Sequence, residues 1–248
     1  MLVHLSAAAG VATITLDSPH NRNALSRQLT AELGDHLTAA GEDPEVRVVL
    51  LRSSGRVFCA GADLTEARNL TGDGPREIVR LQRRIAALPK PVVVELAGPV
   101  RAGGLGLVGA ADIVIAAASV TFALTEVRLG LAPAAISVSL LSRLTPRAAA
   151  DLFLSARTFD AAEAAAIGLI TRCVPDDDLP AAVTETLTDL LKADPQGLAE
   201  TKRLLTAEML TRIDRDGEQA ARRSAELFAS PRAQQAMRDF LTRTKPAT

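Results

Sequence analysis

Two kinds of hydrophobic pattern alternate along the first half of the chain. The short apolar runs Val11–Leu16 and Val46–Leu51 are rich in β-branched residues and leucine, which predicts buried strands. Between them, leucines recur every four residues over 29–37, the spacing of one helix face. Ser26 precedes this stripe and can cap the helix, and Asp43-Pro44 ends it. We therefore predict a strand, a helix and a strand in that order.

The same alternation continues further along the chain. A second helical stripe over 78–88 stops at a proline, and the β-branched run Val92–Val94 follows. A Pro/Gly loop, Gly98–Gly106, leads into a small-residue helix, and apolar segments return at Ile113–Ala117 and Val120–Ala123. Strands that alternate with helices are typical of parallel sheets, so we predict an α/β fold.

Beyond Pro133 the pattern is almost entirely helical. One helix is predicted over 134–144, and Thr145-Pro146 supplies the N-cap and first residue of another. Asp160 with Glu163 forms a capping box for a short helix that closes at a glycine.

Three more helices are predicted in the last seventy residues, over 179–192, 195–209 and 215–242. We expect a core over residues 1–190. The helical region 191–248 is expected to pack on that core or on a neighbouring subunit.

Composition narrows the possible partners. The 248 residues are 48% apolar, which is typical of a globular chain with a substantial core. A net charge of −1 argues against nucleic acid as the main partner, because phosphate binding needs a basic field. With six Phe, no Tyr and no Trp, a base-stacking surface is not expected.

Cysteine and histidine usage points to a reducing compartment and to no metal. Cys59 and Cys173 form no CxxC pair, and His4, His20 and His36 are scattered. No apolar run approaches the ~20 residues of a membrane span, and no signal-peptide pattern follows the first residues. We expect a cytoplasmic protein with no membrane partner.

Two segments combine small residues with side chains that are candidates for a binding or catalytic site. In CAGADL, Cys59–Leu64, the Ala-Gly-Ala run lets the backbone approach another group closely, and Asp63 can cap a helix. Taken alone, this segment also fits an ordinary strand–turn–helix junction. The polar, glycine-rich residues 64–75 are expected to form a mobile segment. Cys59 has no visible base beside it and is interpreted as a small buried residue.

The second segment is the glycine run 103–109. It holds a literal GxGxxG at Gly104, Gly106 and Gly109, with the acid Glu126 about 20 residues further on, which is the spacing of a dinucleotide site. The loop over 97–102 is long for that fold. Close packing of a helix on its neighbour explains the glycines equally well, so both interpretations stay open at this point.

Glu126 stands among apolar residues, which would raise the pKa of its carboxyl group and suit it to proton transfer. Earlier in the chain, His20 and Arg22 lie in a turn where they could meet a phosphate-bearing ligand, although a solvated turn is as good an interpretation. The predicted strand over 92–94, the glycine loop that follows it and the start of the next helix can together point backbone N–H groups at an oxygen atom of a ligand.

Taken together, these segments resemble the crotonase superfamily, the enoyl-CoA hydratase/isomerase family. The similar pieces are SPHNRNALS, VFCAGADL, KPVVVELAGPVRAGGLGLVGAADI and FALTEVRLGLAP, in the family's order and spacing. The likeness extends to about residue 190, and the tail is similar to the family's helical C-terminal region. The resemblance implies a spiral of repeated ββα units, a homotrimer or a dimer of trimers, and acyl-CoA ligands.

Positions in the chain can be matched to the family's functional residues. The resemblance implies that the N–H groups of Ala62 and Gly103 form an oxyanion hole and that Glu126 is a catalytic acid/base. The residues implied to line the coenzyme A thioester are His20, Asn21, Arg22, Ala24, Ala60, Asp63, Leu64, Gly104, Gly106 and Thr125. No other cofactor is expected.

The chain also departs from the family pattern. Family hydratases carry a first catalytic glutamate where this chain has Gly106, and a Gly-Gly pair where it has residues 134–137. A family isomerase uses a single glutamate at the position of Glu126. Small residues at 104 and 106 are expected to leave room for a water molecule or a branched acyl chain.

The expected function is therefore an acyl-CoA-processing enzyme, hydratase-like, of fatty-acid or branched acyl-CoA metabolism, that stabilises a thioester enolate. The alternatives are a Δ3,Δ2-enoyl-CoA isomerase and a CoA-binding protein without hydratase activity. A nicotinamide dinucleotide-binding protein is the remote alternative.

Overall fold

The computed structural model describes residues 1–66 and 73–243. Its main sheet has six strands in the order β1-β2-β3-β4-β6-β9, so the strand order follows the chain. The bounds are β1 Val3–Ala8, β2 Val11–Leu16, β3 Val48–Ser53, β4 Val92–Leu96, β6 Ile113–Ala117 and β9 Arg172–Val174. Within this sheet only the β1–β2 pair is antiparallel, and the predicted α/β class with parallel strands is confirmed.

The inner strands form the densest part of the core. Val92, Val93 and Val94 have no exposed surface, and their partners on β3 and Val114 on β6 are also buried. Strands covered on both faces are continuous apolar runs, which is why the sequence identified them. The edge strands β1 and β9 were not predicted, because they are half exposed and lack such a run.

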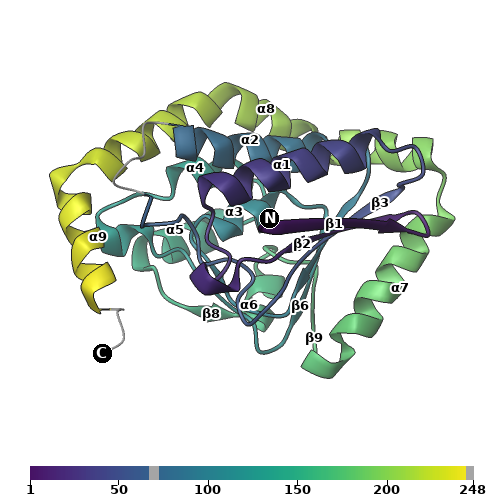
Figure 1. The fold of residues 1–248 in the computed structure, drawn as a ribbon, viewed down its shortest axis with the longest axis horizontal. Coiled ribbons are helices and arrows are strands. Elements are labelled where there is room, and N and C mark those ends of the chain that lie inside the picture. The colour runs from purple at the N-terminus through teal and green to yellow at the C-terminus, as the bar shows by residue number, and fades with distance from the viewer. Residues whose placement is uncertain (67–72, 244–248) are drawn as a thin grey trace.

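Helices cover both faces of this sheet (Figure 1). The helices α1 (Arg27–Glu42) and α2 (Asp73–Ala87) lie along one face, and the long helix α8 (Pro195–Ala229) lies over α2. Helix α7 (Leu179–Lys192) packs on the other side against β3, β4 and β6. The C-terminal helical region is thus packed on the core of its own chain.

A small second sheet builds the region around Glu126. Strand β5 (Val100–Arg101) pairs in parallel with β7 (Thr121–Ala123), and β7 pairs with β8 (Phe159–Asp160). Two phenylalanines, one on β7 and one on β8, stack with ring centroids 5.4 Å apart. The register aligns Arg101 with Ala123, three residues before Glu126.

The remaining elements are short, except for α9 at the C-terminal end. They are the helices α3 Gly104–Ala110, α4 Ala134–Leu140, α5 Pro146–Ser155, α6 Ala161–Ala166 and α9 Pro231–Arg243, and the 3-10 turns η1 Pro19–Asn21, η3 Glu126–Leu129 and η4 Asp176–Asp178.

The predicted helix starts are confirmed by their caps. The Ser26 Oγ accepts a hydrogen bond from the N–H of Leu29 at 3.2 Å, and Thr145 caps α5 in the same way. Asp160 caps α6 through the N–H of Glu163 at 2.8 Å. The Glu163 carboxylate pairs with Arg157 instead of returning to the cap, so the box is only half formed.

Three predicted boundaries are wrong. Helix α8 runs without interruption through the break predicted between 209 and 215, because Ile213 continues its buried stripe. The helix predicted over 215–242 is divided at Ser230-Pro231, since the residue before a proline avoids the helical conformation. Helix α4 ends at Leu140 rather than at 144. Of the segment 64–75, residues 67–72 lie outside the described residues.

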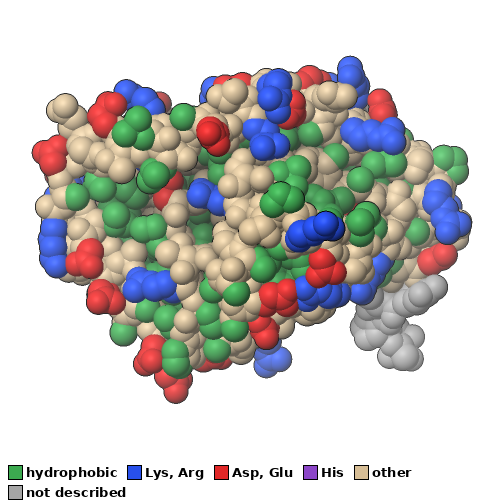
Figure 2. Space-filling view, turned by 180° about the vertical axis from the view of Figure 1, so that it is seen from behind, with side chains coloured by type: hydrophobic (Ala, Val, Ile, Leu, Met, Phe, Trp, Pro, Cys, Tyr) green, Lys and Arg blue, Asp and Glu red, His purple; other side chains and the backbone are tan. Residues whose placement is uncertain are grey.

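The described helices include none that is both long and apolar enough to cross a membrane. On the face shown in Figure 2, Lys and Arg side chains are interspersed with Asp and Glu rather than gathered into one basic field.

Candidate active site

Two turns from distant parts of the chain meet beside the small sheet. Cys59 and Val100 form an isolated parallel β-bridge. The carbonyl of Cys59 accepts a hydrogen bond from the N–H of Arg101 at 2.9 Å. A Cβ built on Gly103 would lie 3.5 Å from the amide nitrogen of Ala62, and one built on Gly61 would lie 3.4 Å from that of Gly103. The two amide-bearing turns are therefore in direct contact.

The backbone in both turns is held in unusual conformations. Gly61 has a φ of +92°, and a Cβ there would lie 2.8 Å from that of Ala102, so only glycine fits. Ala102 itself has a φ of +45° and donates its N–H to the carbonyl of Ala123 at 3.0 Å. This bond ties the turn before Gly103 to the end of β7.

The amides of Ala62 and Gly103 have no acceptor among the described residues, whereas those of Asp63 and Ala102 do. Asp63 donates to the carbonyl of Leu25, and Gly106 donates to that of Gly103. Adjacent backbone donors without protein acceptors are suited to bind an oxygen of a ligand.

Glu126 follows the same small sheet and begins η3. Its Oε2 is inaccessible to solvent and has no hydrogen-bond partner within the described part of the chain. Burial removes the water that would stabilise the charged form and raises the pKa of this carboxyl group to about 7. A carboxyl group that titrates near neutral pH can both accept and return a proton.

A cavity of about 560 Å³ joins the two turns to Glu126. Most of the predicted site residues line it, namely His20, Asn21, Arg22, Ala24, Ala60, Ala62, Asp63, Leu64, Gly103, Thr125 and Glu126. The structure thus brings together in one cavity the residues that sequence reasoning grouped as a site.

Gly104 and Gly106 are placed differently and are absent from the cavity lining. A Cβ at Gly104 would lie 2.7 Å from that of Cys59, and one at Gly106 would lie 2.7 Å from Cγ2 of Ile136. The open space predicted beside these two glycines is therefore filled by packed side chains. The glycines let α3 approach its neighbours closely.

A buried hydrogen-bond network of Gln82 and Ser139 contacts the backbone of Gly106. The Gln82 side chain has no exposed surface and donates to the carbonyls of Ile78 and Ala135. Its Oε1 accepts from the Ser139 Oγ at 2.6 Å, and that hydroxyl is also 3.3 Å from the carbonyl oxygen of Gly106. These bonds fix α2, α3 and α4 relative to one another, so the wall beside Gly106 is rigid.

The glycine pattern does not build a dinucleotide site. A Cβ on Gly109 would also lie within 3 Å of protein atoms, those of Ser139 and Leu140, so these glycines face packed helices. The main sheet shows no reversal of strand order, which is where doubly wound folds bind dinucleotides.

Basic side chains surround the cavity without acidic partners. Arg22, Arg101 and Arg128 line it, and within the described residues none forms an ion pair. Burial lowers the pKa of Arg101, whose guanidinium donates to backbone carbonyls and to Thr121 Oγ1. The cavity is therefore suited to an anionic ligand.

The carboxylate of Asp63 is engaged in hydrogen bonds within the protein. It accepts hydrogen bonds from Asn21 at 3.0 Å and from the N–H of Thr65 at 2.9 Å. Burial works against ionisation, but bonds from Thr65, Asn21 and the N–H of Glu66 outweigh it and lower the pKa of Asp63. Asp63 therefore holds the turn over 20–22 in place and is less suited to proton transfer than Glu126.

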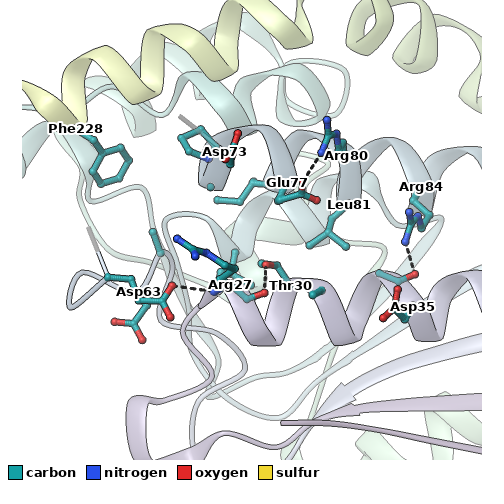
Figure 3. A pocket seen from close by; sticks show the side chains of 18 residues that line it. Arg27, Thr30, Asp35, Asp63, Asp73, Glu77, Arg80, Leu81, Arg84 and Phe228 are labelled. Carbon is teal, nitrogen blue, oxygen red and sulfur yellow. Dashed lines mark hydrogen bonds and ion pairs between the residues drawn. The ribbon is translucent and has the colours of Figure 1, made fainter. Parts of the chain in front are cut away.

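A second cavity of about 610 Å³ lies between α1 and α2 (Figure 3). It shares five lining residues with the first cavity, namely Ala62, Asp63, Pro75, Ile78 and Phe228. Its charged groups are largely used within the protein: Arg80 pairs with Glu77, and Arg84 donates to the carbonyl of Gly34. We therefore place the reacting groups in the first cavity.

The described residues show no metal cluster, and Cys59 is not suited to act as a nucleophile. Cys59 is fully buried, and burial raises the pKa of its thiol to about 12. Across residues 1–66 and 73–243, no three His, Cys, Asp or Glu side chains are grouped so that they could hold a metal ion.

Part of the cavity wall comes from residues that the sequence did not identify. They are contributed by α4, α8 and α9 and include Ile136, Ser224, Phe228, Phe240 and Leu241. The buried stripe of α8 gives one local signal, because Ser224 falls where an apolar residue is expected. The location of the others depends on tertiary packing.

The chain was compared with known proteins. Residues 6–247 match the model of the family described as enoyl-CoA hydratase/isomerase. The 1,2-epoxyphenylacetyl-CoA isomerase of Escherichia coli K12 is 33% identical over 233 residues, which cover 88% of each chain.

Solved structures agree with this match. An enoyl-CoA hydratase from Mycobacterium avium is 47% identical with a TM-score of 0.91, covering 99% of this chain and 98% of that one. A methylmalonyl-CoA decarboxylase is 25% identical with a TM-score of 0.85, covering 100% of this chain and 98% of that one. The predicted crotonase-type α/β fold with a helical C-terminal region is confirmed.

Proposed function

The chain belongs to the enoyl-CoA hydratase/isomerase family, and from this premise we propose that it binds an acyl-CoA thioester in the cavity beside Glu126. The thioester oxygen accepts hydrogen bonds from the N–H groups of Ala62 and Gly103. Glu126 then moves a proton to or from the carbon next to the carbonyl group.

The two free amides support the first step. When the α-carbon loses a proton, negative charge develops on the thioester oxygen, and preorganised donors stabilise that charge. The turns that carry Ala62 and Gly103 touch each other, which supports the proposal that both amides bind the same oxygen atom. Losing one such donor typically costs about 3 kcal/mol of transition-state stabilisation.

Glu126 supports the second step and is the single observation that carries the proposal. Its buried Oε2 has no partner in the described part of the protein, and its pKa of about 7 suits reversible proton transfer. Asp63, the other acid in the lining, is held by Asn21 and Thr65.

Of the family's reactions, we propose proton transfer within the acyl chain, as in a Δ3,Δ2-enoyl-CoA isomerase. Hydration by two carboxylates would need a second acid facing the cavity. Position 106 offers none, and Ile136 and Gln82 occupy the space beside it. The relative named as an epoxyphenylacetyl-CoA isomerase is consistent with isomerase chemistry.

Hydratase activity is the second candidate, because the Mycobacterium avium structure at 47% identity is described as an enoyl-CoA hydratase. In that reaction Glu126 alone would activate the water. A CoA-binding role without turnover would keep affinity for the thioester but give no product.

The basic side chains around the cavity suit the phosphate groups of coenzyme A. Arg22 and Arg128 are exposed and have no acidic partner among the described residues, and His20 lies in the same turn as Arg22. We propose that the turn over 20–24 follows the coenzyme, and that Ala60 and Leu64 contact the thioester arm. Thr125, beside Glu126, is proposed to contact the acyl group.

One assay separates these reactions. Crotonyl-CoA and a 3-enoyl-CoA are incubated separately with the wild type and with Glu126→Gln, and products are identified by mass and chromatography. We expect the wild type to convert the 3-enoyl-CoA to its 2-enoyl isomer and Glu126→Gln to lose at least a hundredfold in rate. Glu126→Gln keeps the size of the side chain but cannot act as a base.

Two results would overturn the proposed chemistry. Equal turnover by the wild type and Glu126→Gln would remove Glu126 from the reaction. A 3-hydroxyacyl-CoA as the main product from crotonyl-CoA would replace isomerisation with hydration. Thioester binding with no turnover would support the non-catalytic role.

A homotrimer or a dimer of trimers is also proposed, from the family resemblance. Light scattering on the purified full chain measures this directly, with three or six times the 26.0 kDa chain mass as the expected result.

A further inference from the structure

Ser224 is a polar residue on the buried face by which α8 packs on the core, as are Lys202 and Thr206. Met209, Ile213 and Ala221 are nearly fully buried along this face, and Phe228 lies one turn beyond Ser224 at the cavity wall. Ser224 is itself only 5% exposed and lines the same cavity. A buried hydroxyl group of α8 therefore faces the cavity, where Ile136 and Phe228 also contribute to the lining.

The hydroxyl of Ser224 does not bond to its own helix. Thr206 and Thr211, on the same helix, donate to the carbonyl four residues earlier, which is the ordinary arrangement for a hydroxyl in a helix. The Ser224 Oγ instead accepts a hydrogen bond from the N–H of Ala135 at 3.1 Å. The rotamer thus directs the oxygen away from α8 and toward the first turn of α4.

This arrangement leaves the Ser224 proton free to be donated. A serine hydroxyl accepts and donates, and within the described residues Ser224 has an acceptor role only. Ile78, Leu131 and Ile136 also line the cavity, and no described residue accepts a hydrogen bond from the Ser224 hydroxyl. A buried donor without an acceptor costs free energy, so an acceptor brought by a ligand would be favoured there.

We propose that Ser224 donates a hydrogen bond to an oxygen atom on the acyl group of the substrate, and so selects acyl-CoA thioesters whose acyl chain carries a hydroxyl or carbonyl oxygen. The inference rests on the proposed function, because it assumes that a thioester occupies this cavity. It adds a substrate class that the amides of Ala62 and Gly103 and the carboxyl group of Glu126 do not define.

Binding of unreactive or slowly reacting thioesters tests this without relying on turnover. Butyryl-CoA, 3-hydroxybutyryl-CoA and 4-hydroxybutyryl-CoA are titrated into the wild type and Ser224→Ala by calorimetry. We expect the wild type to bind at least one hydroxylated ligand about fivefold to tenfold more tightly than butyryl-CoA, the effect of one hydrogen bond. Ser224→Ala should bind all three ligands with equal affinity, within a factor of two.

Ser137→Ala is the matched control. Ser137 lies on α4, and its hydroxyl donates to the carbonyl of Ala134 at 2.7 Å without lining the cavity. This variant should keep the preference of the wild type. It separates the loss of the Ser224 hydroxyl from a general loosening of α4.

The outcomes distinguish this inference from the function on which it rests. If butyryl-CoA does not bind the wild type, the acyl-CoA function fails and this inference fails with it. If butyryl-CoA binds but the wild type shows no preference for either hydroxylated ligand, only the role of Ser224 is overturned. The same holds if Ser224→Ala keeps the preference, which would leave Ser224 as a cap for the N–H of Ala135.

Discussion

Ile136 occupies the space that a side chain at Gly106 would need. A Cβ built on Gly106 lies 2.7 Å from Cγ2 of Ile136 and 3.1 Å from Cδ of Gln82. Ile136 is 2% exposed and Gln82 is fully buried, so both belong to the packed surroundings of Gly106. Glycine at 106 and isoleucine at 136 thus fit each other, and together they leave Glu126 as the carboxyl group available for chemistry.

The first prediction concerns this contact. Gly106→Ala should lower the free energy of unfolding by about 1–3 kcal/mol, because an isoleucine branched at Cβ has few alternative rotamers with which to escape overpacking. Gly106→Glu should be less stable still and should form no more 3-hydroxyacyl-CoA from crotonyl-CoA than the wild type. Urea denaturation and product analysis measure the two effects.

Gly197→Ala is the control for the first prediction. A Cβ at Gly197 meets nothing within 4 Å, so alanine there should be neutral or should stabilise α8 by up to about 1 kcal/mol. Equal unfolding free energies of Gly106→Ala and the wild type would show that Ile136 and Gln82 can shift to accept a Cβ at little cost in free energy.

The second prediction follows from the raised pKa of Glu126. Between the unfolded pKa of 4.5 and the folded pKa of about 7, the folded chain keeps a proton that the unfolded chain releases. Stability from this group is therefore present below pH 4.5 and is lost as the pH rises through 7. Glu126→Gln, which cannot ionise, should be more stable than the wild type at pH 8, by on the order of 3 kcal/mol at most, and nearly equal to it at pH 4.5.

Thermal or urea unfolding of both proteins from pH 4.5 to pH 8 measures this difference. A constant difference across the range would contradict a raised pKa at Glu126. If Glu126→Gln were less stable than the wild type at pH 8 and approached it at low pH, the carboxylate would be stabilised by a partner in the folded chain.

The sequence predicted the parts of this protein that depend on local patterns. Capped helix starts such as Ser26 and Asp160 could be predicted because a capping side chain acts within four residues. Buried parallel strands could be predicted because both of their faces are apolar. The edge strands β1 and β9 could not, since a half-exposed strand has no such run.

For the site, the turns containing Ala62 and Gly103 and the acid Glu126 were predicted as one group, and they line one cavity. What could not be predicted is the opposite wall. The contact of Ile136 with Gly106 and the placement of Ser224 both depend on how α4 and α8 pack on the core. For the same reason Gly106 was expected to leave open space, although its surroundings are filled.

The third prediction concerns the attachment of α8. Lys202 is 5% exposed, and its Nζ lies 2.7 Å from Oδ2 of Asp112 while also donating to the carbonyls of Ile85 and Lys90. Lys202→Met removes one partner of a buried ion pair and leaves Asp112 with the N–H of Val92 and the more distant charge of Arg143. The expected loss is about 3–5 kcal/mol of unfolding free energy, measured by urea denaturation.

Lys192→Met is the matched control for Lys202→Met. Lys192 pairs with Asp189 at 2.8 Å, but the two side chains are 70% and 65% exposed. Exposed pairs contribute little, so this variant should change stability by less than about 0.5 kcal/mol. Similar losses of unfolding free energy in both variants would contradict the prediction that burial makes the Lys202–Asp112 pair contribute more to stability than an exposed pair.

The central claim, that the two amides and Glu126 together form and protonate a thioester enolate, is tested most directly by hydrogen exchange at the α-carbon. Butyryl-CoA, which has no double bond to hydrate or isomerise, is incubated in D2O with the wild type or Glu126→Gln and followed by proton NMR. The wild type should replace the α-protons with deuterium, and Glu126→Gln should slow this exchange at least a hundredfold. Absence of exchange in the wild type despite bound butyryl-CoA, or equal exchange in both proteins, would contradict the claim.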